Sequence, residues 1–371
     1  MSKILIMTNH SYMLYRFRLE LIQELKKEHD VVLSMPFVGH EDDFRALGLR
    51  CIETDVDRRG LNPVTDLRLF RTYQKLLKEE RPALVITYSI KPNIYGGLAC
   101  RMAGIPYCAN VQGLGTAFQR KGLARFVTVL YRLALRNAKT VFFENKANAE
   151  EFCRRRILPA RKETILPGAG INLEQYPYVP YPENEAVRFL YLGRIMKEKG
   201  MDELFAAMRR LRARYGAGVV LDIVGFYDDD FYKEQVDRLV ADGIAVFHGF
   251  QNDPFPYYAA ADCVVLPSYH EGMSNVLLEA ASIGRPVITS DIPGCREAAE
   301  DGRTGFLCKA GDADSLYEQM SRMAETPLAE RQAMSWAGRE KMAREFAKQA
   351  VVEKTIAALG CSQAAAGPAR V

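Results

Sequence analysis

The chain has 371 residues, too many for one ordinary hydrophobic core and enough for two domains. With 48% hydrophobic and 26% charged residues, its composition is that of a globular protein. No apolar run approaches the roughly 20 residues that a membrane-spanning helix needs, and a net charge of +4 singles out no class of partner.

The eight cysteines are scattered along the chain, with no C-x-x-C pair and no spacing typical of metal ligands. Such residues fit buried thiols in a reducing compartment, so we expect a cytoplasmic protein. The sequence opens with a short apolar run, Ser2 to Met7, which polar residues follow at once. This run is too short for a signal peptide and is predicted to be the first core strand.

The first half of the chain alternates short apolar runs with longer amphipathic stretches. Strands are predicted at 3–8, 31–35, 83–88, 107–111 and 140–144, and helices at 15–27, 65–80, 94–103 and 123–137. Alternation of this kind is typical of parallel strands joined by crossover helices. We therefore predict a Rossmann-like, doubly wound α/β domain over residues 1–172.

Three prolines within six residues, at positions 177, 180 and 182, interrupt this alternation. Because proline neither pairs within a sheet nor continues a helix, residues 173–187 are predicted to be an interdomain linker. A second series follows, with strands at 189–192, 219–224, 246–247, 263–266, 286–289 and 305–308 and helices at 202–215, 232–241, 274–283 and 313–325. It predicts a second Rossmann-like domain over 188–350, followed by a helix end and disordered tail over 351–371. Two such domains facing each other would form a cleft at the carboxyl ends of their strands.

The first candidate site follows the first strand of the second half, from Gly193 to Gly200. A glycine at a strand end lets a ligand approach the backbone, and Arg194 and Lys199 can converge on one diphosphate. A helix that begins at Gly200 would add its N-terminal amides. The alternative interpretation is a solvated basic turn.

The second candidate site lies between an apolar strand and an apolar helix, from Pro267 to Glu279. Ser274 is predicted to be the helix N-cap, which leaves nearby amides for phosphate oxygens. Glu271 in the loop and Glu279 in the second helical turn can contact different parts of one ligand. Alternatively, Glu279 is a salt-bridged helix residue and Glu271 a loop charge.

These two elements together resemble the retaining family 4 glycosyltransferases of GT-B fold, and the resemblance runs from the first strand to about residue 350. The segments 87–96 and 110–116 resemble the branch that builds capsule, O-antigen or lipid-linked oligosaccharides. Members of that branch transfer N-acetylhexosamines such as GalNAc from UDP-sugars to polyprenyl-diphosphate acceptors. The resemblance therefore implies donor binding in the second domain and acceptor binding in the first.

The resemblance also implies a role for each motif residue. Arg194 and Lys199 would stabilise the departing diphosphate, Glu271 would bind hydroxyls of the donor sugar, and Glu279 would accept hydrogen bonds from the ribose. Further donor contacts are implied at Gly193, Phe250, Gly272, Met273, Ser274 and Asn275, with Phe250 against the base. The family needs no metal or other cofactor, and the acidic run 228–230 is predicted to cap a helix.

Two loops of the first half depart from the family pattern. Residues 8–11 stand where many members have a Gly-Gly loop, and residues 111–113 stand where many have a histidine. His10 is therefore the candidate for a catalytic group on the acceptor side, although a loop histidine can equally be structural. Further acceptor-side candidates are Lys91, Gln112 and Asn145.

The stretch from Ala109 to Phe143 carries six basic residues and no Asp or Glu. Within it, the segment from Arg120 to Lys139 alternates cations with apolar residues. Such a helix can pack its apolar side into the core, or it can dock on an anionic membrane surface. The second interpretation predicts a protein on the inner face of the plasma membrane.

The sequence therefore predicts a retaining, metal-independent glycosyltransferase with a nucleotide-sugar donor and a lipid-linked glycan acceptor. Alternatives are a UDP-sugar 2-epimerase or hydrolase on the same fold, and a two-lobed nucleotide-sugar-binding protein without activity. A dinucleotide-dependent oxidoreductase would need G-x-G-x-x-G after a first strand, and neither half has it. No motif indicates binding to nucleic acid.

Overall fold

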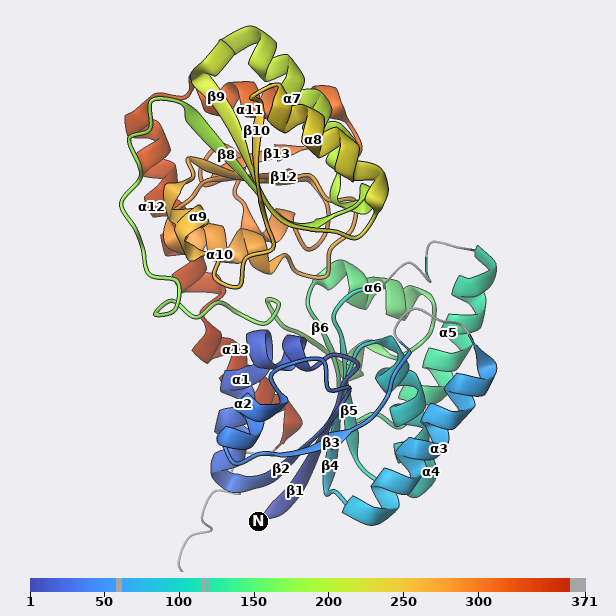
Figure 1. Cartoon of the computed structure of the whole chain (residues 1–371). Helices are drawn as coiled ribbons and strands as arrows, with labels where there is room; N and C mark the ends of the chain where they lie inside the picture. Colours follow the sequence, from blue (N-terminus) through green and yellow to red (C-terminus); the bar gives the residue numbers. More distant parts are fainter. Residues whose placement is uncertain (58–61, 115–117, 119–120, 361–371) are drawn as a thin grey trace, which may run out of the picture. The chain divides into compact units, whose positions relative to one another are not determined.

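The computed structural model describes residues 1–57, 62–114, 118 and 121–360, and these form two compact units (Figure 1). Unit 1 consists of Met1–Ala169 and the segment that begins at Gln349, and unit 2 is Gly170–Lys348. Two α/β units with parallel sheets confirm the predicted fold class. The predicted disordered tail falls on residues 361–371, outside the described residues.

Unit 1 is built on a sheet of seven parallel strands in the order β3-β2-β1-β4-β5-β6-β7. The strands are β1 (Ser2–Met7), β2 (His29–Met35), β3 (Arg50–Glu53), β4 (Leu84–Tyr88), β5 (Tyr107–Val111), β6 (Val141–Phe143) and β7 (Glu163–Ile165). The helices are α1 (Ser11–Glu28), α2 (Glu41–Ala46), α3 (Pro63–Glu80), α4 (Gly97–Ala103), α5 (Lys121–Leu135), α6 (Lys146–Arg154) and α13 (Lys348–Leu359). The strand order is that of a Rossmann-type sheet, extended by one strand at its edge.

The alternation of side chains along β1 divides the core of unit 1 between the two faces of the sheet. Leu5 and Met7 belong to one buried cluster, which contains residues of α3 and α5. Ile4 and Ile6 belong to the other, which contains residues of α1 and also Val351, Val352 and Leu359 of α13. The last helix, which the sequence analysis set apart from the second domain from residue 351 on, therefore packs in the core of unit 1.

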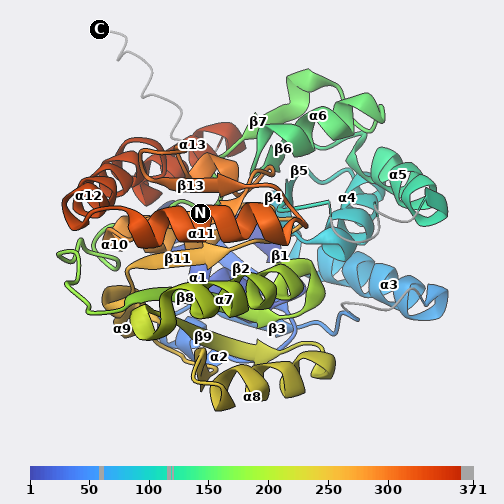
Figure 2. The ribbon, with the colours of Figure 1, turned by 90° about the horizontal axis from the view of Figure 1, so that it is seen from above.

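Unit 2 contains six parallel strands in the order β10-β9-β8-β11-β12-β13. The strands are β8 (Val187–Ile195), β9 (Val219–Tyr227), β10 (Ala245–Gly249), β11 (Cys263–Leu266), β12 (Val287–Ser290) and β13 (Gly305–Cys308). The helices are α7 (Met201–Tyr215), α8 (Lys233–Ala241), α9 (Phe255–Ala260), α10 (Asn275–Ile283), α11 (Ala313–Glu325) and α12 (Leu328–Glu345). Helices α7 and α11 pack side by side along this sheet (Figure 2).

Residues 173–187, predicted to be a linker, are part of unit 2. Tyr176 and Tyr181 are buried, and the Tyr181 hydroxyl donates to the Asp262 carbonyl oxygen at 2.9 Å. Arg339 donates to the carbonyl oxygens of Leu173 and Tyr176. The prolines do exclude regular structure here, but buried aromatic rings and hydrogen bonds to arginine fix the segment on the unit.

Arg285 is fully buried, and each of its five N–H bonds donates to a backbone carbonyl oxygen at 2.9–3.1 Å. The acceptors lie in α9, at the end of α10 and in the segment 173–187: Tyr258, Ala259, Gly284, Val179 and Pro180. A buried guanidinium is tolerated only when its donors are satisfied, and here backbone oxygens satisfy all of them.

Candidate active site

The loops after β8 and β11 leave neighbouring strands at the point where the strand order of unit 2 reverses. In open parallel sheets, ligands bind at this point, outside the carboxyl ends of the strands. Gly193 has φ 152°, and a Cβ placed on Gly225 would lie 1.8 Å from the Gly193 carbonyl oxygen. Glycine is therefore required where β8 and β9 approach each other at this edge.

Gly200 brings the loop after β8 against the loop after β11. Its φ is 74°, and a Cβ at this position would lie 2.1 Å from the Pro267 carbonyl oxygen. Across this contact the Lys199 Nζ lies 2.5 Å from the Glu271 Oε1, which also accepts from the Ser268 hydroxyl at 2.8 Å. Two residues predicted separately thus form one ion pair, with side chains only 18% and 14% exposed.

Arg194 lies at the same edge and is more open to solvent, with 45% of its side chain exposed. Its Nη1 lies 3.2 Å from the Asp228 Oδ2, a partner that the sequence analysis missed. The next residue, Asp229, accepts a hydrogen bond from the Phe231 N–H at 3.0 Å. The prediction that the acidic run caps a helical turn is therefore confirmed for Asp229, whereas Asp228 pairs with the predicted diphosphate ligand.

Helix α10 starts beside the ion pair, but its N-terminus differs from the prediction. Ser274 is at the N-cap position without a capping hydrogen bond from its side chain, and its N–H donates to the Gly294 carbonyl oxygen at 2.9 Å. The expectation that this amide is left for phosphate is therefore wrong. Gly294, with φ 87°, packs so closely that a Cβ would meet the carbonyl oxygens of Gly272 and Glu271 at 2.5 and 2.7 Å. The Pro-Gly pair at 293–294 is the turn signal that could have indicated this loop.

Three other predicted donor-side residues differ in exposure. Met273 is 6% exposed and belongs to the core of unit 2, so its side chain is structural. Glu279 is also 6% exposed, and its Oε2 accepts a hydrogen bond from the Tyr258 hydroxyl at 2.9 Å. Phe250 is 56% exposed and packs edge-to-face on Phe226, which is 45% exposed, with 6.0 Å between ring centroids. These two rings offer an open aromatic surface beside the ends of β9 and β10.

In unit 1, a cavity of about 320 Å³ lies where β1, β4 and β5 end. It brings His10 and Gln112 together with residues that the sequence analysis did not single out. The lining residues are Asn9, His10, Tyr12, Met13, Ser89 and Gln112. Ser89 has φ 75°, a strained value for a non-glycine residue that is typical of functional sites.

The other two acceptor-side candidates do not line this cavity. The Lys91 Nζ lies 2.7 Å from the Asp66 Oδ1, and the Tyr95 hydroxyl donates to the other oxygen of the same carboxylate at 2.8 Å. Asn145 is the N-cap of α6, where its side chain accepts from the Asn148 N–H at 2.8 Å. The Lys91 ion pair joins this residue to α3, whereas the Asn145 contact is a local helix cap.

Comparison with known proteins connects these sites to a family. The models "Glycosyl transferase 4-like" and "Glycosyl transferases group 1" match residues 3–145 and 186–326. The chain is 31% identical over 332 residues to the Campylobacter jejuni N,N'-diacetylbacillosaminyl-diphospho-undecaprenol alpha-1,3-N-acetylgalactosaminyltransferase, covering 84% of this chain and 86% of that protein. The chain belongs to the family 4 glycosyltransferases.

Further relatives and structures agree with this family. An Escherichia coli UDP-Gal:alpha-D-GlcNAc-diphosphoundecaprenol alpha-1,3-galactosyltransferase is 27% identical to this glycosyltransferase, with 81% of each chain covered. Among solved structures, Anabaena HepE in complex with UDP and glucose has a TM-score of 0.80 and 18% identity, covering 97% of this chain and 100% of the other. That likeness supports the GT-B fold.

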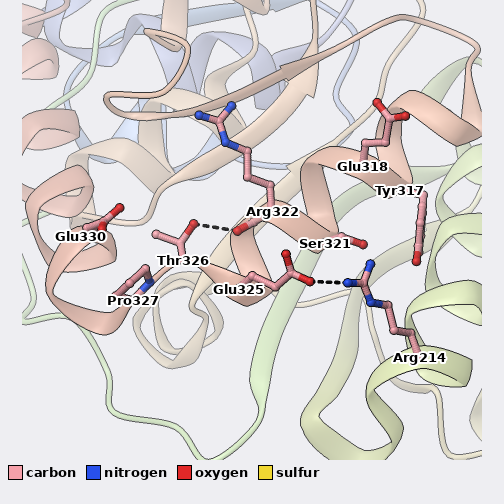
Figure 3. A pocket seen from close by; sticks show the side chains of 9 residues that line it. All are labelled: Arg214, Tyr317, Glu318, Ser321, Arg322, Glu325, Thr326, Pro327 and Glu330. Atoms are coloured by element: carbon pink, nitrogen blue, oxygen red, sulfur yellow. Dashed lines mark hydrogen bonds and ion pairs between the residues drawn. The ribbon is translucent and has the colours of Figure 1, made fainter.

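Besides the cavity of unit 1, this glycosyltransferase has a cavity of about 440 Å³ in unit 2, between α7, α11 and α12 (Figure 3). Its charges are mixed, and Arg214 donates to Glu325 at 2.6 Å across it (Figure 3). Helices that follow parallel strands run back along the sheet, so the C-terminal ends of α7 and α11 lie at the edge opposite the loops after β8 and β11. The cavity is therefore separate from the candidate donor site.

Within the parts of the glycosyltransferase that the structure describes, no group of three or more His, Cys, Asp or Glu residues is arranged to hold a metal ion. No described helix is both long and apolar enough to cross a membrane.

Proposed function

We propose that this glycosyltransferase is a retaining, metal-independent enzyme that moves a sugar from a UDP-sugar to a polyprenyl-diphosphate-linked or polysaccharide acceptor. The sugar proposed is an N-acetylhexosamine such as GalNAc. One observation is the main support for the donor site: the Lys199–Glu271 ion pair lies where the strand order of the unit 2 sheet reverses, beside the N-terminus of α10. A cation, a carboxylate and helix amides at one edge can bind the diphosphate and the sugar of one donor.

The chemistry proposed assigns a role to each charged group. Lys199 and Arg194 stabilise the negative charge that develops on the diphosphate as the anomeric C–O bond breaks. Glu271 holds hydroxyls of the donor sugar, and Glu279 holds the ribose. The acceptor oxygen bonds to the anomeric carbon on the face that the diphosphate leaves, and a leaving phosphate oxygen takes the acceptor proton. In this scheme the donor displaces the resting contact between Lys199 and Glu271 when it binds.

The proposed substrates are based on the names of two relatives and on the side chains that line the unit 1 cavity. Both curated relatives described above are, by name, transferases acting on sugars linked to undecaprenyl diphosphate, and one name specifies UDP-Gal. The unit 1 cavity is lined mostly by polar, uncharged side chains that can bind sugar hydroxyls. His10 lines this cavity and is proposed to contact the acceptor hydroxyl.

Nucleotide binding tests the donor site without an acceptor. A ligand that binds only the native state, at 100 times its Kd, stabilises a protein by about 2.7 kcal/mol, so thermal shifts with UDP, GDP and ADP in the presence of EDTA identify the base. Lys199→Ala and Glu279→Ala should abolish transfer, whereas Lys197→Ala removes an exposed lysine from the same loop and should not. Full turnover in either site variant would refute the assignment, and product analysis separates transfer from hydrolysis or epimerisation.

We also propose that α5 of unit 1 docks on an anionic membrane. Its outer face exposes Phe126, Val129 and Leu133 by 58%, 49% and 44%, and their spacing places them on one side of the helix. Exposed cations flank this strip: Arg125, Arg132, Arg136 and Lys139. Arg132 donates to the carbonyl oxygens of Arg155 and Arg156, and Lys139 donates to that of Leu359. The charges of Arg125 and Arg136 are therefore the ones most open to lipid headgroups, at about 1 kcal/mol each near the surface.

The basic run on α7 provides a contrast, because Arg210 pairs with Asp314 and Arg214 with Glu325. Binding to vesicles of phosphatidylglycerol and phosphatidylcholine, measured by cosedimentation, tests the proposal. Replacing the three apolar residues of the α5 strip by serine keeps the charge and should abolish binding. The matched control, Val240→Ser on α8, removes another exposed apolar residue and should bind as the native chain does. Equal binding of both variants would overturn the membrane assignment.

A further inference from the structure

We infer that Tyr258 is a positioning residue for the donor ribose, acting through Glu279; the inference rests on the proposed donor site. Tyr258 lies on α9 and is fully buried, and its hydroxyl donates to the Glu279 Oε2 at 2.9 Å. The proposed function assigns Glu279 to the ribose without stating what holds its carboxylate in place. The sequence places the two residues 21 positions apart and in different helices, with no motif joining them.

The carboxylate of Glu279 needs such a partner because it is only 6% exposed. A buried carboxylate is stable only when hydrogen-bonded, and a bond from a hydroxyl to a charged oxygen is among the stronger ones. Glutamate has three rotatable side-chain bonds, and the tyrosine bond fixes the last of them. The carboxylate is then oriented before the ribose arrives, which lowers the entropic cost of binding.

The position of Tyr258 is itself fixed from its backbone. The Tyr258 carbonyl oxygen accepts from the Arg285 Nε at 3.0 Å, and the next carbonyl, that of Ala259, accepts from Arg285 Nη2 at 2.9 Å. The same guanidinium also binds the carbonyl oxygens of Val179 and Pro180. The short helix α9 is therefore anchored at two consecutive residues, and the Tyr258 ring presents its hydroxyl to Glu279 from a rigid support.

The discriminating measurement compares UDP with 2′-deoxy-UDP by titration calorimetry on the full chain. If Glu279 accepts a hydrogen bond from the 2′-hydroxyl, the native protein should bind UDP about tenfold or more tightly than the deoxy analogue. Tyr258→Phe should reduce this ratio to about threefold or less, because the carboxylate loses the hydrogen bond from the Tyr258 hydroxyl that orients it. It should also raise the KM for the donor and leave the KM for the acceptor unchanged.

Tyr181→Phe is the matched control, since it removes the hydroxyl of another buried tyrosine of unit 2 that donates at 2.9 Å. Its hydrogen bond goes to the Asp262 carbonyl oxygen, just before β11 and at the opposite edge of the sheet from Glu271. A purely structural effect of losing a buried hydroxyl would lower the melting temperature in both variants and leave the UDP ratio as in the native chain.

The outcomes separate this inference from the proposed function. If UDP binds and the ratio in Tyr258→Phe equals that of the native chain, Tyr258 does not position the ribose ligand and the inference is refuted while the donor site stands. GDP and ADP with their 2′-deoxy analogues are titrated in parallel, so a different base gives the same test. If no nucleoside diphosphate binds the native protein, the donor site and the inference built on it are both wrong.

Discussion

Replacing Arg285 by methionine should destabilise unit 2 without touching the proposed ligand contacts directly. The side chain is fully buried, and methionine is an unbranched apolar side chain that ends near the position of the arginine Nε and has no N–H groups. The change removes one donor from each of five backbone carbonyl oxygens, although that of Tyr258 still accepts from the Ala261 N–H at 3.2 Å. Gly284 is buried, so water does not reach its carbonyl oxygen, whereas the carbonyls of Val179, Pro180 and Ala259 belong to partly or fully exposed residues.

The magnitude follows from these five acceptors. A buried acceptor that loses its partner costs about 1–3 kcal/mol, and one that water can reach costs a few tenths. The Gly284 oxygen therefore costs about 2 kcal/mol and the other four oxygens about 0.3 kcal/mol each, a sum of about 3 kcal/mol. For a unit of this size each kcal/mol lowers the melting temperature by about 2–4 °C, so the transition of unit 2 should move down by about 6–12 °C.

Scanning calorimetry of the full chain measures this shift. Arg285→Lys retains the charge but has only three donors, and it should give an intermediate loss. Arg209→Met makes the same change of charge on the exposed side of α7 and should shift the transition by less than about 2 °C. A drop of less than about 3 °C for Arg285→Met would refute the reasoning, because the buried carbonyls would then have found other partners.

Two further substitutions test local geometry and charge. Gly200→Ala places a Cβ 2.1 Å from a backbone oxygen at φ 74°, so it should lower the free energy of unfolding by about 2 kcal/mol or more and weaken UDP binding. The control Gly216→Ala, with φ 57° and open space around its Cβ, should lower the free energy of unfolding by only about 1 kcal/mol and leave UDP binding unchanged. Equal effects of the two substitutions would contradict the contact. Burial raises the pKa of Glu80, but hydrogen bonds from Lys3 and Arg50 outweigh it and hold this pKa below its usual value. Its ion pairs therefore stabilise the fold above the unfolded pKa, and this stabilisation is lost as pH falls through the folded pKa. The melting temperature of Glu80→Gln should lie below that of the native chain at pH 7 and approach it at acid pH. A difference in melting temperature that stays constant with pH would refute this prediction.

The main architecture is predictable from the sequence because strands buried on both faces are continuous apolar runs. The two strands that the prediction missed, Arg50–Glu53 and Glu163–Ile165, lie at the edges of the unit 1 sheet. Both are short and only partly buried, so no apolar run marks them. Tertiary packing likewise decides that α13 belongs to unit 1, since its residues follow unit 2 directly in the chain.

Prediction of the candidate site from the sequence is limited in the same way, because tertiary contacts decide it. Lys199 and Glu271 can each be recognised from local motifs, but their contact joins residues 72 positions apart and depends on β8 lying next to β11. Tyr258 and Gly294 carry no local signal of function, because their roles come from contacts with residues on other elements. Sequence patterns indicate the ligand groups, whereas the residues that orient them appear only in three dimensions.

Helix α13 completes the hydrophobic core of unit 1 with residues that follow unit 2 in the chain. Val351, Val352 and Leu359 complete the buried cluster that contains Ile4 and Ile6. During synthesis the whole of unit 2 leaves the ribosome before α13 does, and unit 2 is continuous in sequence. The domain that is made first is therefore the one completed last, and until α13 emerges the apolar surface that this helix covers lacks its cover.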